Sequence, residues 1–323
     1  PKATYLVNPP GFPRNRLYQS RGFDGVDSVT PVYIGIAEWR NPEDPLQTRT
    51  IYVMGFDPMN SGFSLAGDDS QLRQLRMPDR VLYDRLSRDE FGPIARMLLN
   101  GEEVSTEING RDVRVVGVYD LGTSFGIDGS IITSDLNFRR IFSNRSASRV
   151  ELGLIKLDPG ASATEVRDRI VSGIPGDVVV LTRDEFIQHE VDYWSNNTPI
   201  GYVFGLGVAM GLAVGLIVVY QILFSDVQDH LREYATMKAM GYSHFFLSRL
   251  VLAEAVILAV LGFIPGYFCS ILVYSQAREA TNLPVIMTHE RALMVLALTV
   301  AMCAISALLA MRKLRSADPA EVF

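Results

Sequence analysis

The chain has 323 residues, of which 48% are hydrophobic and 20% are charged, and its net charge is −6 at pH 7. This composition excludes intrinsic disorder and collagen-like repeats, and the acidic balance offers no basic surface to nucleic acid. The two cysteines, Cys269 and Cys303, are too few for a disulfide framework or a four-thiolate metal site.

Residues 1–193 carry alternating strand-like and helix-like patterns. Runs rich in β-branched and aromatic residues predict strands over 29–39, 48–56, 111–120, 129–134, 150–157 and 177–182. A hydroxyl residue followed three positions later by glutamate, a helix-start pattern, occurs at Ser162/Glu165 and again at Thr182/Glu185. We therefore expect an α+β domain, whose last helix, at about 183–193, leads almost directly into a more apolar region.

Three long uncharged runs follow this domain. They lie between Trp194 and Ser225, over 255–276 and over 292–311. A helix needs about 20 apolar residues to cross the hydrocarbon core of a bilayer, and three such runs fit buried helices of a soluble protein less well. We predict an α-helical membrane protein with three transmembrane helices in this chain. The expected segments are a domain at 1–197, spans at 198–224, 250–276 and 292–311, connections at 225–249 and 277–291, and a tail at 312–323.

Basic residues set the expected orientation. The connection at 225–249 and the tail carry six of them, namely Arg232, Lys238, Arg249, Arg312, Lys313 and Arg315, whereas the connection at 277–291 carries Arg278 and Arg291. By the positive-inside rule, the first connection and the tail lie in the cytoplasm and residues 1–197 lie on the opposite side. Because such a domain needs an export signal or a preceding span, we expect a further transmembrane helix ahead of residue 1 and four spans in the complete protein.

No motif in the sequence points to catalysis or cofactor binding. The histidines at positions 189, 230, 244 and 289 lack metal-ligand spacing, and there is no G-x-S-x-G nucleophile motif. The chain also lacks G-x-x-x-x-G-K-S/T, the loop that cradles nucleotide phosphates. We therefore predict no catalytic residue, metal or cofactor in this chain, and a membrane-bound enzyme is the least favoured interpretation.

Small and acidic residues inside the predicted spans are candidates for helix contacts. Glycines recur at four-residue spacing, at Gly207, Gly211 and Gly215 in the first span and at Gly262 and Gly266 in the second. Such strips let helix backbones approach closely in lipid, either within one chain or between two copies. Glu254 is an acid inside the second span, for which we expect a structural ion pair or helix-end contact rather than a proton relay.

The connection at 225–249 combines basic and aromatic residues. We expect the first helix to continue from Asp226 to Met240, Gly241 to adopt the left-handed conformation that ends a helix, and Ser243 to cap the next helix. The candidate docking residues are Arg232, Glu233, Lys238, Gly241, Tyr242, Ser243, Phe245, Phe246 and Arg249. Docking into a groove of another protein and a solvated turn at the membrane surface both remain open.

The segment REYATMKAMGYS (232–243) resembles the signature of FtsX/MacB-like ABC transporter permeases, and Glu254, the glycine pair and the tail at 317–323 follow as they do in that family. Four longer segments, at 83–95, 132–142, 198–222 and 310–323, are similar to the DevC-type permeases of cyanobacteria. This second resemblance covers nearly the whole chain, whereas the superfamily motif covers only its membrane half.

The resemblance implies the permease subunit of an ABC exporter in the inner membrane, with its large domain in the periplasm. Such a permease forms a homodimer, and ATP is bound by a separate DevA-like ATPase that contacts the loop from Arg232 to Arg249. A DevB-like periplasmic adaptor, a TolC-like outer-membrane channel and a glycolipid cargo are implied as well. The alternative is an FtsX-like signalling or scaffold protein that activates a periplasmic cell-wall hydrolase.

Overall fold

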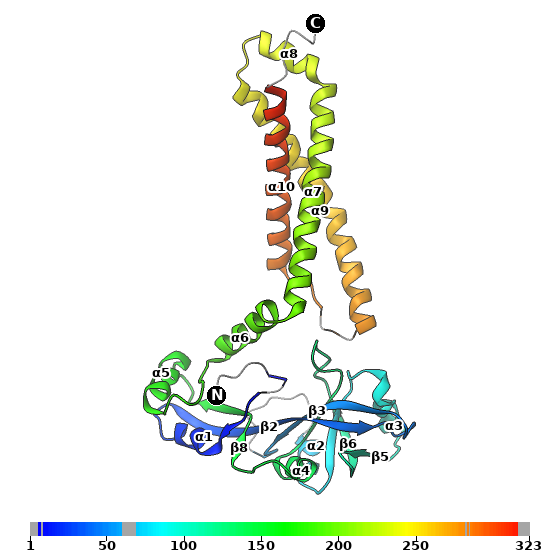
Figure 1. Ribbon diagram of the computed structural model, residues 1–323, viewed down its shortest axis with the longest axis vertical. Helices are drawn as coiled ribbons and strands as arrows, with labels where there is room; N and C mark the ends of the chain where they lie inside the picture. The colour runs from blue at the N-terminus through cyan, green and yellow to red at the C-terminus, as the bar shows by residue number, and fades with distance from the viewer. Residues whose placement is uncertain (1–5, 8, 60–68, 282, 284, 316–323) are drawn as a thin grey trace. The chain divides into compact units, whose positions relative to one another are not determined.

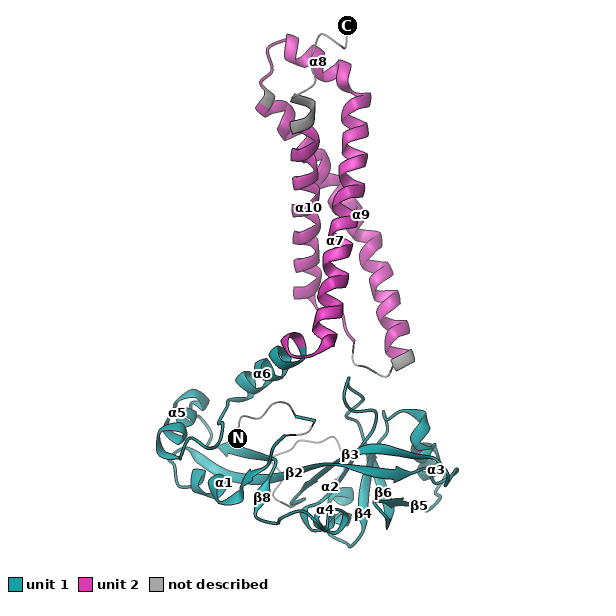
Figure 2. Cartoon of the chain, viewed as in Figure 1, with its two compact units in different colours: residues 1–194, 280–284 teal, residues 195–279, 285–323 magenta. Residues whose placement is uncertain are grey.

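The computed structural model describes residues 6–7, 9–59, 69–281, 283 and 285–315. The chain divides into two compact units, residues 1–194 with 280–284 and residues 195–279 with 285–323 (Figure 2). Unit 1 contains the sheet with short helices, and unit 2 contains the long helices (Figure 1).

A mixed seven-stranded sheet organises unit 1. Its strands are β2 (Val26–Arg40), β3 (Thr48–Phe56), β4 (Arg80–Asp84), β5 (Val104–Ile108), β6 (Arg111–Tyr119), β7 (Ser130–Ser134) and β9 (Leu152–Leu157). They follow the order β3-β7-β4-β6-β5-β2-β9, with parallel β3–β7 and β4–β6 pairs among antiparallel ones. Because β3 also pairs with β2, the first six strands form a continuous ring of pairings. The predicted α+β fold class is confirmed.

The long strand β2 belongs to two parts of this sheet. Its first half pairs with β9 from Val26 to Val32, and its second half pairs with β3 from Tyr33 to Arg40. Short elements surround the sheet: β1 (Phe12–Pro13) paired with β8 (Arg149–Val150), the helices α1 (Arg14–Ser20), α2 (Asp69–Gln74), α3 (Ile94–Leu99), α4 (Asp135–Ile141), α5 (Ala163–Gly173) and α6 (Arg183–Asn196), and a 3₁₀ turn at Asp89–Phe91.

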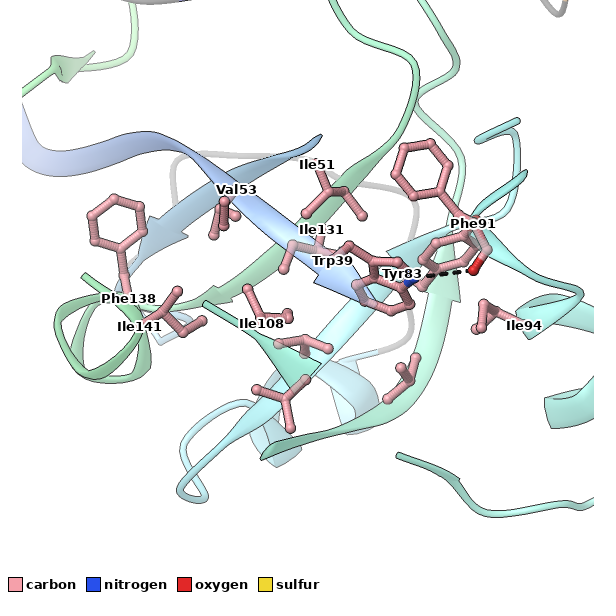
Figure 3. Packing of buried hydrophobic residues seen from close by; sticks show 14 of the residues in the cluster. Trp39, Ile51, Val53, Tyr83, Phe91, Ile94, Ile108, Ile131, Phe138 and Ile141 are labelled. Carbon is pink, nitrogen blue, oxygen red and sulfur yellow. Dashed lines mark hydrogen bonds between the residues drawn. The ribbon is translucent and has the colours of Figure 1, made fainter. Parts of the chain in front are cut away.

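The alternating side chains of these strands enter two buried clusters. On β3, Ile51 and Val53 pack in one cluster and Tyr52 packs in the other, as the two-residue period of a strand requires. Trp39 is the largest buried side chain of the first cluster, and its indole Nε1 donates a hydrogen bond of 3.0 Å to the carbonyl oxygen of Phe91 (Figure 3). Both faces of the sheet are therefore covered, which accounts for the near-continuous apolar sequence of its central strands.

A buried carboxylate ties the end of β4 to the loop before β7. Asp84 is fully buried and accepts hydrogen bonds from the backbone N–H groups of Leu86 (3.1 Å), Leu121 (3.0 Å) and Gly122 (2.9 Å). The hydroxyl of Ser130 donates a fourth bond of 3.1 Å. With its acceptor capacity used inside the fold, Asp84 has a structural role.

Some of the helix caps and strands predicted for unit 1 are confirmed and others are wrong. The Thr182/Glu185 capping box forms in both directions, and Ser162 caps α5 by accepting from the Glu165 N–H. The predicted strand over 177–182 is wrong, since this segment pairs with no strand among the described residues. Its valines instead pack against the apolar face of α5. The strands β4 and β5 were not predicted.

The described residues of unit 2 contain, after the end of α6, the helices α7 (Pro199–Asp229), α8 (Leu231–Ala239), α9 (His244–Thr281) and α10 (His289–Arg315). Three segments, Pro199–Asp229, Phe245–Glu279 and His289–Met311, are long and apolar enough to cross a membrane, as predicted. Helix α10 packs along α7, where the Ser306 hydroxyl donates to the Leu216 carbonyl oxygen at 3.2 Å.

We predict that Asp84→Ala destabilises unit 1 by roughly 3 kcal/mol or more, because the substitution leaves several buried donors without an acceptor. Asp120→Ala is the matched control, since Asp120 is 42% exposed and is paired with the exposed Arg85. This control should cost less than about 1 kcal/mol. Urea unfolding followed by tryptophan fluorescence measures both, and equal losses would contradict the structural role of Asp84.

Candidate functional site

The connection between α7 and α9 turns at His230. Helix α7 ends at Asp229, and α8 begins at Leu231 after His230 with φ −96° and ψ 13°. The expected continuous helix from Asp226 to Met240 is therefore wrong. The imidazole Nδ1 of His230 lies 3.0 Å from the Asp226 carbonyl oxygen, an acceptor that the helical backbone also uses, and such competition favours a helix end.

The end of α8 is a complete Schellman motif. The N–H of Tyr242 donates to the carbonyl of Met237 at 3.2 Å, and the N–H of Gly241 donates to that of Lys238 at 3.0 Å. Gly241 has a φ of +97°, in the left-handed region that glycine enters at little cost. The expected role of Gly241 as a helix end is confirmed.

Helix α9 starts at His244, three residues after Gly241, with an aromatic group at its first turn. The Ser243 hydroxyl accepts from the Phe246 N–H at 3.3 Å, as expected of a helix cap. The rings of Tyr242 and Phe246 lie 4.9 Å apart, and the guanidinium carbon of Arg249 lies 5.8 Å from the centre of the Phe245 ring. Backbone capping and ring contacts thus fix the geometry of this turn.

The connection between α7 and α9 has one exposed side and one buried side. All nine candidate docking residues are exposed, and Phe245 is 70% exposed although it is a large apolar side chain. Tyr234 of α8 and Leu247 of α9 face the other way, into a buried cluster at this end of the bundle. The other buried members of that cluster are Leu223, Val227, Val251, Ala255, Ala259, Cys303, Ala307, Ala310 and Met311. We call the exposed residues of 232–249 named above the connection surface.

The basic side chains of the connection surface are the next feature of this site. Among the described residues, neither Arg232 nor Lys238 forms an ion pair with a carboxylate. The cations of this surface are therefore available to an acidic partner.

Acidic groups gather just behind the turn. The carboxyl group of Glu254 lies close to that of Asp226, and His230 Nδ1 lies 3.6 Å from Asp226 Oδ1. The Asp226 carbonyl and then its carboxylate raise the pKa of His230 above its ordinary value. Burial and the nearby Glu254 carboxyl raise the pKa of Tyr234. Sequence reasoning missed Asp226 and His230 as members of this group, although their spacing of four residues could have indicated it.

The predicted packing glycines have different surroundings. A Cβ atom at Gly215 would lie 2.8 Å from the sulfur of Met302, so a side chain here would push against α10. No described atom lies within 4 Å of such a position at Gly207, Gly211, Gly262 or Gly266. Only Gly215 meets another helix within the described part of this chain. Within the same ranges, no three His, Cys, Asp or Glu side chains are grouped as metal ligands would be.

We predict that Gly241→Ala weakens the end of α8 by about 1 kcal/mol, because alanine is strained at φ +97°. The backbone N–H groups of Gly241 and Tyr242 donate the bonds of this turn, so residues 241–242 should exchange hydrogen faster in the variant. Gly205→Ala is the control, since Gly205 lies inside α7 with open space around it. Unchanged exchange at 241–242 would contradict the assigned cap.

We also predict that His230 keeps its proton to a higher pH than an ordinary histidine. A raised pKa means that His230 stabilises the fold fully below its unfolded pKa of 6.5, and that this stabilisation is lost as pH rises through the higher folded pKa. Titration of labelled histidine by NMR, assigned with His230→Gln, measures the value. Asp226→Asn should lower it by removing the carboxylate, and an unchanged value in this variant would contradict the assignment.

Comparisons with known proteins give one family match. Residues 205–319 match the family described as FtsX-like permease C-terminal. A search of curated proteins finds no match.

Two solved outer-domain structures resemble part of the chain. One is the extracellular domain of the noncanonic ABC-type transporter YknZ from Gram-positive bacteria, with a TM-score of 0.37 and 12% identity, covering 54% of this chain and 91% of that one. The other is the periplasmic region of MacB from Actinobacillus actinomycetemcomitans, with a TM-score of 0.37 and 14% identity, covering 57% of this chain and 83% of that one. The chain is thus similar to the FtsX-like permeases over residues 205–319, which hold most of the three helices long and apolar enough to cross a membrane.

Proposed function

We propose that this chain is the membrane subunit of an ABC-type exporter and that the connection surface receives a separate ATPase. The observation that carries the proposal is the fixed turn at 241–246, which displays aromatic side chains beside the guanidinium of Arg249. Exposed apolar side chains gathered in one place are typical of interaction sites. These 323 residues contain no G-x-x-x-x-G-K-S/T loop, and we assign ATP binding to an ATPase that lies outside them.

The partner's docking groove should be apolar and acidic. Phe245 and Tyr242 supply apolar anchors that are 70% and 46% exposed, and aromatic residues of this kind are frequent among the energetically dominant residues of interfaces. Arg232 and Lys238, which have no ion-pair partner within the described part of the chain, favour a groove with carboxylates at its rim. The ATPase therefore binds an element already held in shape by backbone hydrogen bonds.

Helix α7 is the proposed route of mechanical transmission. It has 31 residues, which corresponds to about 46 Å at 1.5 Å per residue, and no proline or break interrupts it after its first residue. One end joins the connection surface through His230, and the other follows α6, the last helix of the outer domain. A movement imposed by the ATPase on α8 reaches unit 1 along this helix without cargo having to cross the bundle.

The remaining features follow from the resemblance to DevC-type permeases. We propose an inner-membrane location with unit 1 in the periplasm, a homodimer, a DevB-like adaptor, a TolC-like channel and a glycolipid cargo. The asymmetry of basic residues in the sequence supports the orientation. The open faces at Gly207 and Gly211 leave room for a helix of a second copy.

An FtsX-like scaffold that activates a periplasmic cell-wall hydrolase is the second candidate function. The family match favours the scaffold and the exporter equally. The matched residues, 205–319, lie outside the domain that would bind either an adaptor or a hydrolase. The full chain, purified with its outer partner after mild cross-linking, separates the two: capture of a membrane-fusion adaptor supports the exporter, and capture of a hydrolase supports the scaffold.

We predict that Arg232→Glu and Lys238→Glu each reduce co-purification of the co-expressed ATPase several-fold, because each replaces an available cation by an acid. Charge reversal at an interface typically costs one to a few kcal/mol, and about 1.4 kcal/mol corresponds to tenfold. Arg278→Glu, at the opposite end of α9, is the matched control and should leave co-purification unchanged. Normal recovery of the ATPase with both test variants would contradict the proposed docking site.

We predict opposite labelling of two engineered cysteines in a background lacking Cys269 and Cys303. An impermeant maleimide, applied to cells with a permeabilised outer membrane, should label Ser146→Cys in unit 1 and should label Tyr242→Cys only after lysis. Both positions are exposed, so accessibility of the side chain does not limit the reaction. The reverse pattern would contradict the proposed orientation.

A further inference from the structure

Unit 1 contains a cavity of about 340 Å³ beside the free edge of its sheet. Its walls come from α1, β9, α5, the segment at 178–182 and the first turns of α6. Ligand pockets span roughly 300–1,000 Å³, so this cavity is at the small end of that range. A single slender chain matches this volume better than a folded or multi-ring molecule.

The walls of the cavity are mostly aliphatic. Leu17 of α1, Leu154 of β9 and Ile170 of α5 line it, together with Ile174 and Phe186. Leu17 and Ile170 are almost completely buried, so their side chains are held in place by the surrounding fold. An apolar ligand segment would leave water on entering this space, which is the main favourable contribution to such binding.

Two segments with strand-like sequences face this cavity without pairing to each other. Strand β9 pairs with β2, and no other strand partner of β9 occurs among the described residues. Across the cavity, 177–182 has the composition of a strand but no strand pairing within the same described ranges. Val179 and Leu181 line the cavity and are 51% and 37% exposed. The cavity therefore has apolar side chains on a side that is open to solvent.

Some charged residues around the cavity form ion pairs or hydrogen bonds with other residues of the chain, and one does not. Arg16 is paired with Asp177 at 3.0 Å, and Glu151 accepts from the Ile34 N–H at 3.1 Å and pairs with Arg145. Arg183 lines the cavity, and its guanidinium group has no ion-pair or hydrogen-bond partner among the described residues.

Groups near Arg183 do not cancel its charge at the cavity wall. The Glu185 carboxylate binds the Thr182 N–H and Arg167, and Asp184 is outside the lining. Arg16 and His189 are the other basic residues of the lining. Arg183 is thus an uncommitted guanidinium, a group whose geometry suits carboxylate and phosphate.

We propose that this cavity binds an amphiphile with one aliphatic chain and an anionic head. The chain lies between β9 and α5, and the head pairs with Arg183. This assignment comes from the lining of the cavity and does not rest on coupling to an ATPase.

Photo-crosslinking of the full chain in phosphatidylcholine nanodiscs tests the proposal. The probe is a palmitate analogue with a mid-chain diazirine, and adducts are mapped by peptide mass spectrometry. We expect adducts in peptides covering 151–155 and 170–183, and competition by unlabelled palmitate but not by inorganic phosphate. Adducts confined to α7, α9 and α10 would mean partition into the bilayer alone and would overturn the proposal.

Two variants and a control separate the parts of the site. Val179→Trp fills the cavity from its exposed side and should abolish adducts in the two peptides, whereas Val171→Trp, 52% exposed and outside the lining, should leave them unchanged. Arg183→Gln should lower palmitate labelling about tenfold, the loss expected for one charged hydrogen bond, without lowering that of the matching alcohol. Equal labelling of all variants overturns the site, and equal labelling by acid and alcohol in the unmodified chain overturns the anionic head.

Discussion

Apolar packing at one end of the long helices is the interaction on which the connection surface depends. Leu223 and Val227 of α7, Val251 and Ala255 of α9, and Ala310 of α10 are almost completely buried there. Elsewhere along the helices large apolar side chains are exposed, as expected for helices that face lipid or another chain. This end is therefore where the chain holds its own helices together.

That packing determines which residues of the connection remain available. Tyr234 and Leu247 join the buried cluster, and the period of α9 then leaves Phe245 and Arg249, two residues on either side of Leu247, outside it. The Schellman turn and the Ser243 cap satisfy the backbone at the two helix ends, so the aromatic residues between them are displayed on an ordered turn. An ordered binding element loses little conformational entropy on docking. Such an element suits a contact that transmits force better than one that adapts to several partners.

Predictions from the sequence were most accurate for features that depend on residues close together in the chain. The uncharged runs, the Gly241 cap, the Ser243 cap and most strands follow from composition or from spacing within a few residues. The prediction failed at 177–182, where valines that favour strands pack on α5 and pair with no strand in the part of the chain that the structure describes. The buried Asp84 was missed for a related reason, since its four donors come from β7 and from loops that only the tertiary fold brings together. The break at His230 arises because its imidazole competes with a backbone N–H for the carbonyl oxygen of Asp226. The periodicity of apolar residues along a helix gives no sign of such competition.

In-cell photo-crosslinking at the connection surface tests the central claim most directly. A benzoylphenylalanine placed at Phe245 should give a light-dependent adduct with a nucleotide-binding protein. The same group at Phe268, which is comparably exposed but lies in the apolar stretch of α9, should give none with that protein. Absence of a protein adduct at Phe245, or an equal adduct at both positions, would contradict the account.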